Sequence, residues 1–314
     1  MSFFEDRRLL VKIAHMYYEE GATQSQIADE IGVSRSLISK YLSKARELGI
    51  VEIIIHDDTI HPFRQLEGKI ERLYGLREVV CVPNLGNESS KARVGAAAGK
   101  YLLRVIRDGQ TIGVSSGTTI HEMVEAISTN QQFPTVTFVP LVGGMGNERV
   151  DIHANHIAAT FAERMQAQYK LLHAPVVVDS KEAKEIFMRQ TSIQNIFSLG
   201  TKANIAIVGI GGTPEHSTMV KSYLGQEHQE YFDQSDVVGD ICYNFINEHG
   251  QASNVSWNEK VIALEVEKLK DIPLVVGVAC GVEKVKAIKA SLEGKLIDVL
   301  VTDEQTAKAL LEEV

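Results

Sequence analysis

The sequence predicts an α/β protein with an N-terminal helix-turn-helix domain, residues 1–56, followed by a larger doubly wound α/β domain, residues 57–314. The first observation is the stretch TQSQIADEIGVSRSLISKYL at residues 23–42, which has the caps, the turn glycine and the apolar spacing of two short helices joined by a tight turn. The second is that, from residue 77 on, runs rich in Val and Ile alternate with helical stretches. Such alternation is typical of a largely parallel sheet covered by helices on both faces.

The composition is that of an ordinary globular chain of 314 residues, with 44% hydrophobic residues and a formal net charge of −9. No apolar run approaches the roughly 20 residues that a membrane-spanning helix needs, so we expect no membrane partner. The first residues, MSFFEDRRLLVKIA, lack the layout of a secretory signal, so we expect a cytoplasmic protein. The three cysteines, Cys81, Cys242 and Cys280, stand apart without the spacing of metal ligands, and we expect neither a metal nor a cofactor. Because the net charge is acidic, binding to nucleic acid must depend on local positive charge.

Three helices are predicted in the small domain. The first covers residues 6–20, where apolar side chains recur at helical spacing: Leu9, Leu10, Ile13, Ala14 and Tyr17. Thr23 is suited to cap the second helix, Gly32 to form the turn through a positive φ, and Ser34 to cap the third. The inward faces of these two helices are Ile27, Ala28 and Ile31, and then Leu37, Ile38, Tyr41 and Leu42. The spacing of Ala28, Gly32 and Ile38 matches a helix-turn-helix.

The outer face of the third helix is basic. Between Val33 and Arg46 there are four cations and no acidic residue. Such a face can enter the major groove of double-stranded DNA, whereas the alternative is a solvated basic face on an ordinary helical hairpin. We expect contacts at or near the bases from Arg35, Ser36, Ser39 and Lys40, a further hydroxyl at Ser34, and phosphate contacts from Gln24, Ser25 and Lys44.

Three further segments connect the two domains. Residues 49–56 (GIVEIIIH) are predicted to form a short strand, and residues 56–63, with Pro62 and two acids, are predicted to be a linker. Residues 63–75 have the apolar spacing of a helix, which is either a connector or a dimer contact.

The larger domain is predicted to contain seven strands and at least five helices. The strands are expected at residues 77–83, 110–115, 135–144, 175–179, 204–212, 273–281 and 297–303. The helices are expected at residues 92–106, 118–127, 154–165, 283–292 and 304–313. In such an open sheet, ligands bind outside the carboxyl ends of the strands.

The most distinctive of the loops at that edge is Ser115–Thr119. Here Ser115, Ser116, Gly117, Thr118 and Thr119 lead directly from a strand into a helix. Free backbone N–H groups, the positive end of a helix and four hydroxyls together predict a phosphate site. The alternative is a helix start capped by Ser or Thr, with no ligand.

Other loops at the same edge provide further candidates. Gly143 and Gly144, and likewise Gly211 and Gly212, follow strands and allow close approach of a ligand, although they are equally expected as plain turn glycines. His153 and Asn155 lie near a helix start, and Asp240 follows Gly239; these groups could hydrogen-bond hydroxyls of a sugar. Lys284 begins a helix, where a cation is unfavourable unless an anion binds nearby, but each of these side chains could equally be an ordinary surface group. The sequence has no HExxH or P-loop motif.

Taken in order, the segments YYEEGATQSQIADEIGVSRSLISKYLSKARELGIVEI, DGQTIGVSSGTT, PLVGG, VGDIC and GVEKVKAI resemble the SorC family of bacterial sugar-sensing transcriptional regulators. The resemblance implies an effector domain similar to ribose-5-phosphate isomerase and glucosamine-6-phosphate deaminase. It also implies a homo-oligomer, a tetramer built as a dimer of dimers, that binds operator DNA and is controlled by a phosphorylated sugar or polyol. By the same resemblance, Ser115, Gly117, Thr118 and Thr119 match the phosphate loop. The glycine loop of the family can carry a lysine where this chain has Val142, so covalent capture of an aldehyde is not expected.

These observations together predict a DNA-binding transcriptional regulator of a carbohydrate operon, with repression relieved by the effector as the commoner family behaviour. Two alternatives belong to other classes of protein. One is an isomerase or deaminase for sugar phosphates, which needs a positioned general base, for which Asp240 is the obvious candidate. The other is an architectural DNA-binding protein whose sugar domain binds no ligand.

Overall fold

The computed structural model describes residues 7–53, 62–85, 89–144, 149–213 and 236–312. The chain divides into two compact units, Met1–Pro62 and Phe63–Val314. The boundary that we predict between residues 56 and 57 lies outside the described residues, and so does most of the predicted linker. Among the described helices, every one is too short or too polar to span a bilayer.

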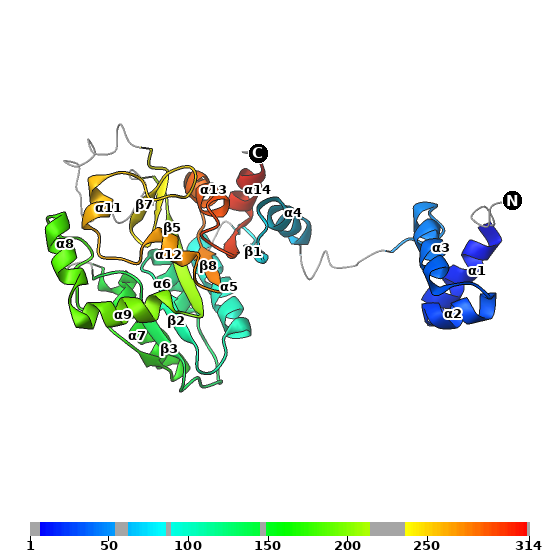
Figure 1. The fold of residues 1–314 in the computed structure, drawn as a ribbon, viewed down its shortest axis with the longest axis horizontal. Helices are drawn as coiled ribbons and strands as arrows, with labels where there is room; N and C mark the ends of the chain where they lie inside the picture. Colours follow the sequence, from blue (N-terminus) through cyan, green and yellow to red (C-terminus); the bar gives the residue numbers. More distant parts are fainter. Residues whose placement is uncertain (1–6, 54–61, 86–88, 145–148, 214–235, 313–314) are drawn as a thin grey trace. The chain divides into compact units, whose positions relative to one another are not determined.

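The smaller unit contains the three predicted helices, α1 (Arg7–Tyr18), α2 (Gln24–Ile31) and α3 (Arg35–Glu47) (Figure 1). Thr23 and Gln26 form a capping box at the start of α2, and the Ser34 hydroxyl accepts the N–H of Leu37 at the start of α3. Gly32 ends α2 with φ 77°, in the left-handed region where glycine is favoured. Both caps and the turn glycine are therefore confirmed.

The apolar faces of α1, α2 and α3 form a separate core of their own. Its buried members are Leu10, Ile13, Met16, Ile27, Ala28, Ile38, Tyr41 and Leu42. The strand predicted from Gly49 is wrong over Gly49–Ile53, which are turn, bend or irregular, and the rest of that stretch lies outside the described residues. Ile53 is exposed, and the described residues of the smaller unit include no strand with which this segment could pair.

The larger unit contains a sheet in the order β1-β9-β8-β5-β2-β3-β4, and every neighbouring pair on this path is parallel (Figure 1). The bounds are β1 Glu78–Val82, β2 Thr111–Val114, β3 Thr137–Pro140, β4 Gln168–Tyr169, β5 Ile205–Gly211, β8 Val275–Val278 and β9 Val299–Asp303. Six of the seven predicted strands form, and the largely parallel sheet is confirmed.

Helices cover both faces of this sheet, as the continuous apolar strands require. On central strand β5, Ile205 and Ile207 face a core shared with α5 (Ser90–Val105), α6 (Thr118–Glu125) and α7 (Ala154–Met165). Ala206 and Val208 point the other way, into a core shared with α4 (Arg64–Tyr74), α13 (Val285–Glu293) and α14 (Glu304–Glu312). The fold is thus the predicted doubly wound one.

Several elements differ from the prediction. Residues 175–179 form only isolated bridges, Gly144 with Pro175 and Val177 with Val261, instead of a strand. An antiparallel hairpin of β6 (Gly239–Ile241) and β7 (Asn244–Ile246) extends from the end of β5, and its strands are too short to give a periodic pattern. The remaining unpredicted elements are β4, η1 Val150–Ile152, α8 Lys181–Met188, α9 Thr191–Thr201, α11 Ser256–Lys260, α12 Val266–Leu269 and η4 Val282–Lys284.

Helix α4 is held against the edge strand β1 by two carboxylates. Glu67, which is buried, accepts the N–H of Cys81 at 3.0 Å, and Glu71 accepts the N–H of Val79 at 3.1 Å. An edge strand otherwise presents such N–H groups to solvent or to another strand. The predicted helix at residues 63–75 is therefore part of the larger unit.

Candidate functional site

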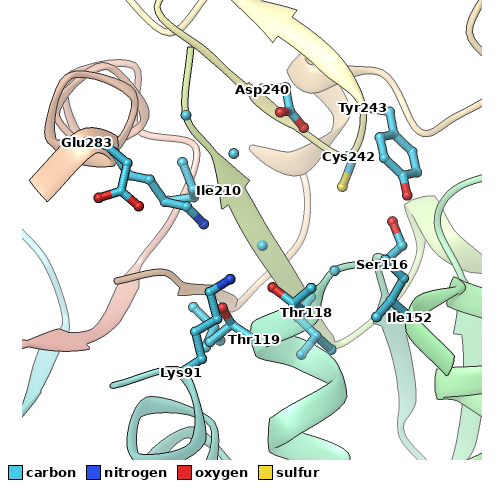
Figure 2. Close-up of a pocket in the computed structure, with 17 residues that line it drawn as sticks. Lys91, Ser116, Thr118, Thr119, Ile152, Ile210, Asp240, Cys242, Tyr243 and Glu283 are labelled. Atoms are coloured by element: carbon cyan, nitrogen blue, oxygen red, sulfur yellow. The ribbon is translucent and has the colours of Figure 1, made fainter. Parts of the chain in front are cut away.

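A pocket lies at the carboxyl ends of the central strands β2, β5 and β8, where ligands bind in open α/β sheets (Figure 2). Its walls come from the loop after β2, the first turn of α6, the end of β5, the β6–β7 turn, η4 and the start of α5. The lining residues are Lys91, Ser116, Gly117, Thr118, Thr119, Ile120, Ile152, Gly209, Ile210, Gly211, Gly212, Asp240, Cys242, Tyr243, Val278, Glu283 and Lys284.

One side of the pocket is the amino-terminal end of α6. Gly117 occupies the N-cap with φ 137°, a conformation that favours glycine, and no side chain caps the helix there. The first N–H groups of an α-helix have no acceptor within the helix, and the helix dipole adds positive potential at the same end. Because Thr118, Thr119 and Ile120 line the pocket, this end of α6 can accept an anion.

Two lysines on other elements line the same pocket. Lys91 lies in the first turn of α5, and its amine points toward the side formed by Thr118 and Thr119 (Figure 2). Lys284 lies at the N-cap of α13, where burial lowers the pKa of its amine and the charge of Lys91 lowers it further. We call Ser116–Thr119, Lys91 and Lys284 together the anion site. An anion bound there would offset the cost of holding two cations close together.

The opposite side of the pocket carries a carboxylate. Asp240 on β6 pairs with Gly211 on β5, and a Cβ on Gly211 would lie 1.9 Å from Oδ1 of Asp240. The absence of a side chain at Gly211 therefore makes room for this carboxylate above the end of β5. A carboxylate at such a position can accept hydrogen bonds from two neighbouring hydroxyls. Burial raises the pKa of the Cys242 thiol, so this thiol stays protonated and supplies no thiolate to the pocket.

Eight of the candidate ligand-binding residues meet in this pocket although they come from distant parts of the sequence: Ser116, Gly117, Thr118, Thr119, Gly211, Gly212, Asp240 and Lys284. Ser115 lies behind the pocket wall, where its hydroxyl accepts the N–H of Gly209 at 3.0 Å. The structure gives Ser115 a supporting position beneath the loop.

The other four predicted residues lie outside the lining of this pocket. Gly143 and Gly144 donate backbone N–H groups to Ile262 and Ala174, and a Cβ on Gly143 would lie 2.4 Å from the carbonyl oxygen of Pro175. His153 is the buried N-cap residue of α7. The amide of Asn155 donates to the carbonyl of Leu172 and accepts its N–H. Their direct contact with a ligand stays a prediction.

Sequence reasoning missed Lys91 and Tyr243. Lys91 is brought to the pocket because α5 packs closely on α6, where a Cβ on Gly95 would lie 2.6 Å from the backbone nitrogen of Met123. The small residues of GAAAG at 95–99 were a usable signal for such close packing. Tyr243 gave no signal, because its position depends on the short hairpin β6–β7.

The smaller unit carries a second candidate site, the outer face of α3. Six of the predicted DNA-contacting side chains are exposed: Ser25 on α2, and Ser34, Arg35, Ser36, Ser39 and Lys40 at or on α3. Gln24 on α2 and Lys44 on α3 are half-buried. Lys44 also forms an ion pair with Glu47 at 3.0 Å. The hydroxyl of Ser34 accepts the N–H of Leu37 and contacts the hydroxyl of Ser36, so its first role is to cap α3.

The comparisons with known proteins cover both units. A family model described as "Putative sugar-binding domain" matches residues 58–312, and a winged helix-turn-helix DNA-binding model matches residues 13–52. The sorbitol operon regulator of Klebsiella pneumoniae is 32% identical over 311 residues, which is 98% of each chain. The chain belongs to the SorC family.

Other members of the SorC family agree with this assignment. The deoxyribonucleoside regulator of Bacillus subtilis is 30% identical over 318 residues, or 99% of each chain. The crystal structure of the full-length sorbitol operon regulator SorC from Klebsiella pneumoniae aligns with a TM-score of 0.75 and covers 98% of this chain and 99% of its own. This SorC-family chain is accordingly a DNA-binding transcriptional regulator with a sugar-binding domain.

Proposed function

We propose that the effector of this SorC-family regulator is a phosphorylated sugar or polyol, whose phosphate occupies the anion site. The observation that carries the proposal is the meeting of an uncapped helix end, on α6, with Lys91 and Lys284 in one pocket. A neutral sugar would bring no negative charge to the helix end and to the two lysines. A phosphate group supplies at least one negative charge and three acceptor oxygens to match them.

The rest of the ligand lies toward Asp240 in this proposal. A carboxylate forms short, strong hydrogen bonds with hydroxyl donors, and neighbouring hydroxyls of a sugar or polyol fit its two oxygens. With a cationic end and a carboxylate end, the pocket favours ligands that carry phosphate at one end and hydroxyls at the other. Glu283, near Lys284, discourages a second phosphate on that side.

In this account, α3 enters the major groove of operator DNA, and the effector binds two arrangements of the protein with different affinity. We further propose that the chain is a repressor released by its effector, that it acts as a tetramer of paired dimers, and that it works in the cytoplasm. The relatives are named as regulators rather than enzymes, which supports a regulatory use of the sugar pocket over catalysis.

The proposal is tested with the full chain and an operator duplex obtained by selection from random DNA. Fluorescence anisotropy measures the affinity for this duplex with and without matched pairs, such as glucose with glucose 6-phosphate and glucitol with glucitol 6-phosphate. We expect a phosphorylated member to change the affinity by about 5- to 150-fold while its unphosphorylated partner does not. Equal effects of both members would contradict the proposal. Turnover of ribose 5-phosphate or glucosamine 6-phosphate would instead favour an isomerase or deaminase.

A further inference from the structure

The turn between β6 and β7 has an unusual backbone. Ile241 pairs with Asn244, so the turn consists of Cys242 and Tyr243 alone, and these have φ 50° and 61°. Two consecutive left-handed residues are typical of tight hairpin turns, but glycine, asparagine and aspartate are the residues usually found there. A cysteine and a tyrosine in this conformation are strained.

The surrounding structure holds this strained turn in place. The indole N–H of Trp257 donates to the carbonyl of Tyr243 at 2.8 Å. The amide of Asn244 donates to the carbonyls of Cys242 and Leu264 at 3.1 and 2.9 Å. Strain that is maintained by several independent hydrogen bonds is a feature of functional sites, and here both turn residues line the pocket.

The side chain of Tyr243 occupies a definite place in the pocket. Tyr243 is 7% exposed and packs with the core on the α13 side of the sheet. Its hydroxyl points toward Ser116, and Asp240 lies on the same hairpin (Figure 2). A phenol can donate one hydrogen bond and accept another, so it can distinguish hydroxyl groups by their position in a way that a carboxylate, which only accepts, cannot.

We propose that Tyr243 is a specificity-determining residue, whose hydroxyl hydrogen-bonds a hydroxyl of the effector between the anion site and Asp240. This inference rests on the proposed function, because it assigns one end of the ligand that the anion site holds. Anchoring and selection are thereby separate: the anion site sets whether a phosphorylated compound binds, and Tyr243 with Asp240 sets which sugar or polyol is preferred. The strained turn keeps the phenol in position for that role.

The test compares the full chain with its Tyr243→Phe variant, which keeps the ring and removes the hydroxyl. Isothermal titration measures Kd for inorganic phosphate, ribose 5-phosphate, glucose 6-phosphate, fructose 6-phosphate and glucitol 6-phosphate. We expect the Kd of the tightest sugar or polyol phosphate to rise by about 3- to 10-fold, with that of inorganic phosphate unchanged. Tyr169→Phe, at an exposed tyrosine on β4, is the matched control and should change neither.

Two further outcomes separate the two proposals. If the unaltered chain binds no compound of the panel, the proposed function fails, and the inference fails with it. If the unaltered chain binds a sugar phosphate and Tyr243→Phe binds the whole panel with the same constants, the proposed function stands and the inference is overturned. Thr118→Val serves as the contrast, because loss of an anchoring hydroxyl should weaken every phosphorylated member, inorganic phosphate included.

Discussion

Ser115 and Gly209 are joined across two neighbouring strands: the hydroxyl of Ser115 accepts the backbone N–H of Gly209 at 3.0 Å. The same hydroxyl donates to the carbonyl of Ser116 at 3.3 Å. Ser115 is 1% exposed, so both bonds are sheltered from water. This residue therefore holds the start of the loop that carries the anion site against β5.

Ser115→Ala should lower the stability of the larger unit. It leaves the N–H of Gly209 without that acceptor, and an unsatisfied buried group of this kind costs about 1–3 kcal/mol. We expect the thermal midpoint of unfolding to fall by roughly 3–8 °C in calorimetry. Ser192→Ala, at an exposed position on α9, is the control. An unchanged midpoint for Ser115→Ala would show that the bond is dispensable.

Thr118→Val should weaken binding of a phosphorylated effector. The substitution keeps the shape of the side chain at the start of α6 and removes a hydroxyl that lines the pocket. Hydrogen bonds to charged groups contribute about 1.5–3 kcal/mol, so the dose response should shift by roughly 10- to 100-fold. The measurement is the effector concentration that half-maximally changes operator binding. Thr160→Val on α7 controls for the loss of a threonine, and an equal shift in both variants would refute the assignment.

Lys284→Met should stabilise the ligand-free protein and weaken effector binding. Burial holds the pKa of Lys284 below its ordinary value, so between the lowered and the ordinary pKa the unfolded chain binds more protons than the folded one. The free energy of unfolding therefore increases as pH rises through that interval. Below it, Lys284 is charged in both the folded and the unfolded chain, and burying this charge lowers the free energy of unfolding by the full amount. Removing the amine should raise the thermal midpoint at pH 7 by roughly 2 °C.

The control for Lys284→Met is Lys286→Met, at an exposed lysine on the same helix. This change should leave both the thermal midpoint and effector binding nearly as they were. A stabilised Lys284→Met protein that still binds the effector with full affinity would place the phosphate away from this lysine.

Arg35→Ala should reduce operator affinity without changing effector binding. Arg35 is exposed at the first position of α3, where the recognition helix of a helix-turn-helix contacts bases. A good base contact is worth about 1–3 kcal/mol, so the Kd for the selected duplex should rise by roughly 5- to 150-fold. Arg7→Ala on α1 is the matched control. Full operator affinity in the Arg35→Ala protein would count against the assignment of α3.

The parts of the fold that sequence predicts well are those decided locally. Thr23, Gly32 and Ser34 act within one turn of chain, so their roles follow from residue type alone. The long apolar runs of β5, β8 and β9 also predict a buried parallel sheet. By contrast, residues 175–179 have the composition of a strand but form only isolated bridges. Whether such a segment pairs as a strand depends on which segments the tertiary fold places beside it.

The candidate site likewise contains some residues that the sequence predicts and others that only the tertiary fold brings into the pocket. The loop at Ser116–Thr119 is visible in sequence because its hydroxyls and glycine are consecutive. Lys91 reaches the pocket through the close packing of α5 on α6, which depends on a contact between Gly95 and the backbone near Met123. Tyr243 adopts a left-handed backbone conformation that is unfavourable for a tyrosine, so the turn preferences of its residue type do not predict the hairpin turn that forms. Both contributions require the assembled fold.

The central claim is that a phosphate binds where α6 begins, between Lys91 and Lys284. A crystal structure of the full chain with the phosphorylated sugar that most strongly alters operator binding tests it most directly. We predict phosphate oxygens within hydrogen-bonding distance of the N–H groups of Thr118 and Thr119, with the hydroxylated end toward Asp240. A phosphate bound elsewhere on the larger unit, with the start of α6 facing the hydroxyl end or solvent, would contradict the account.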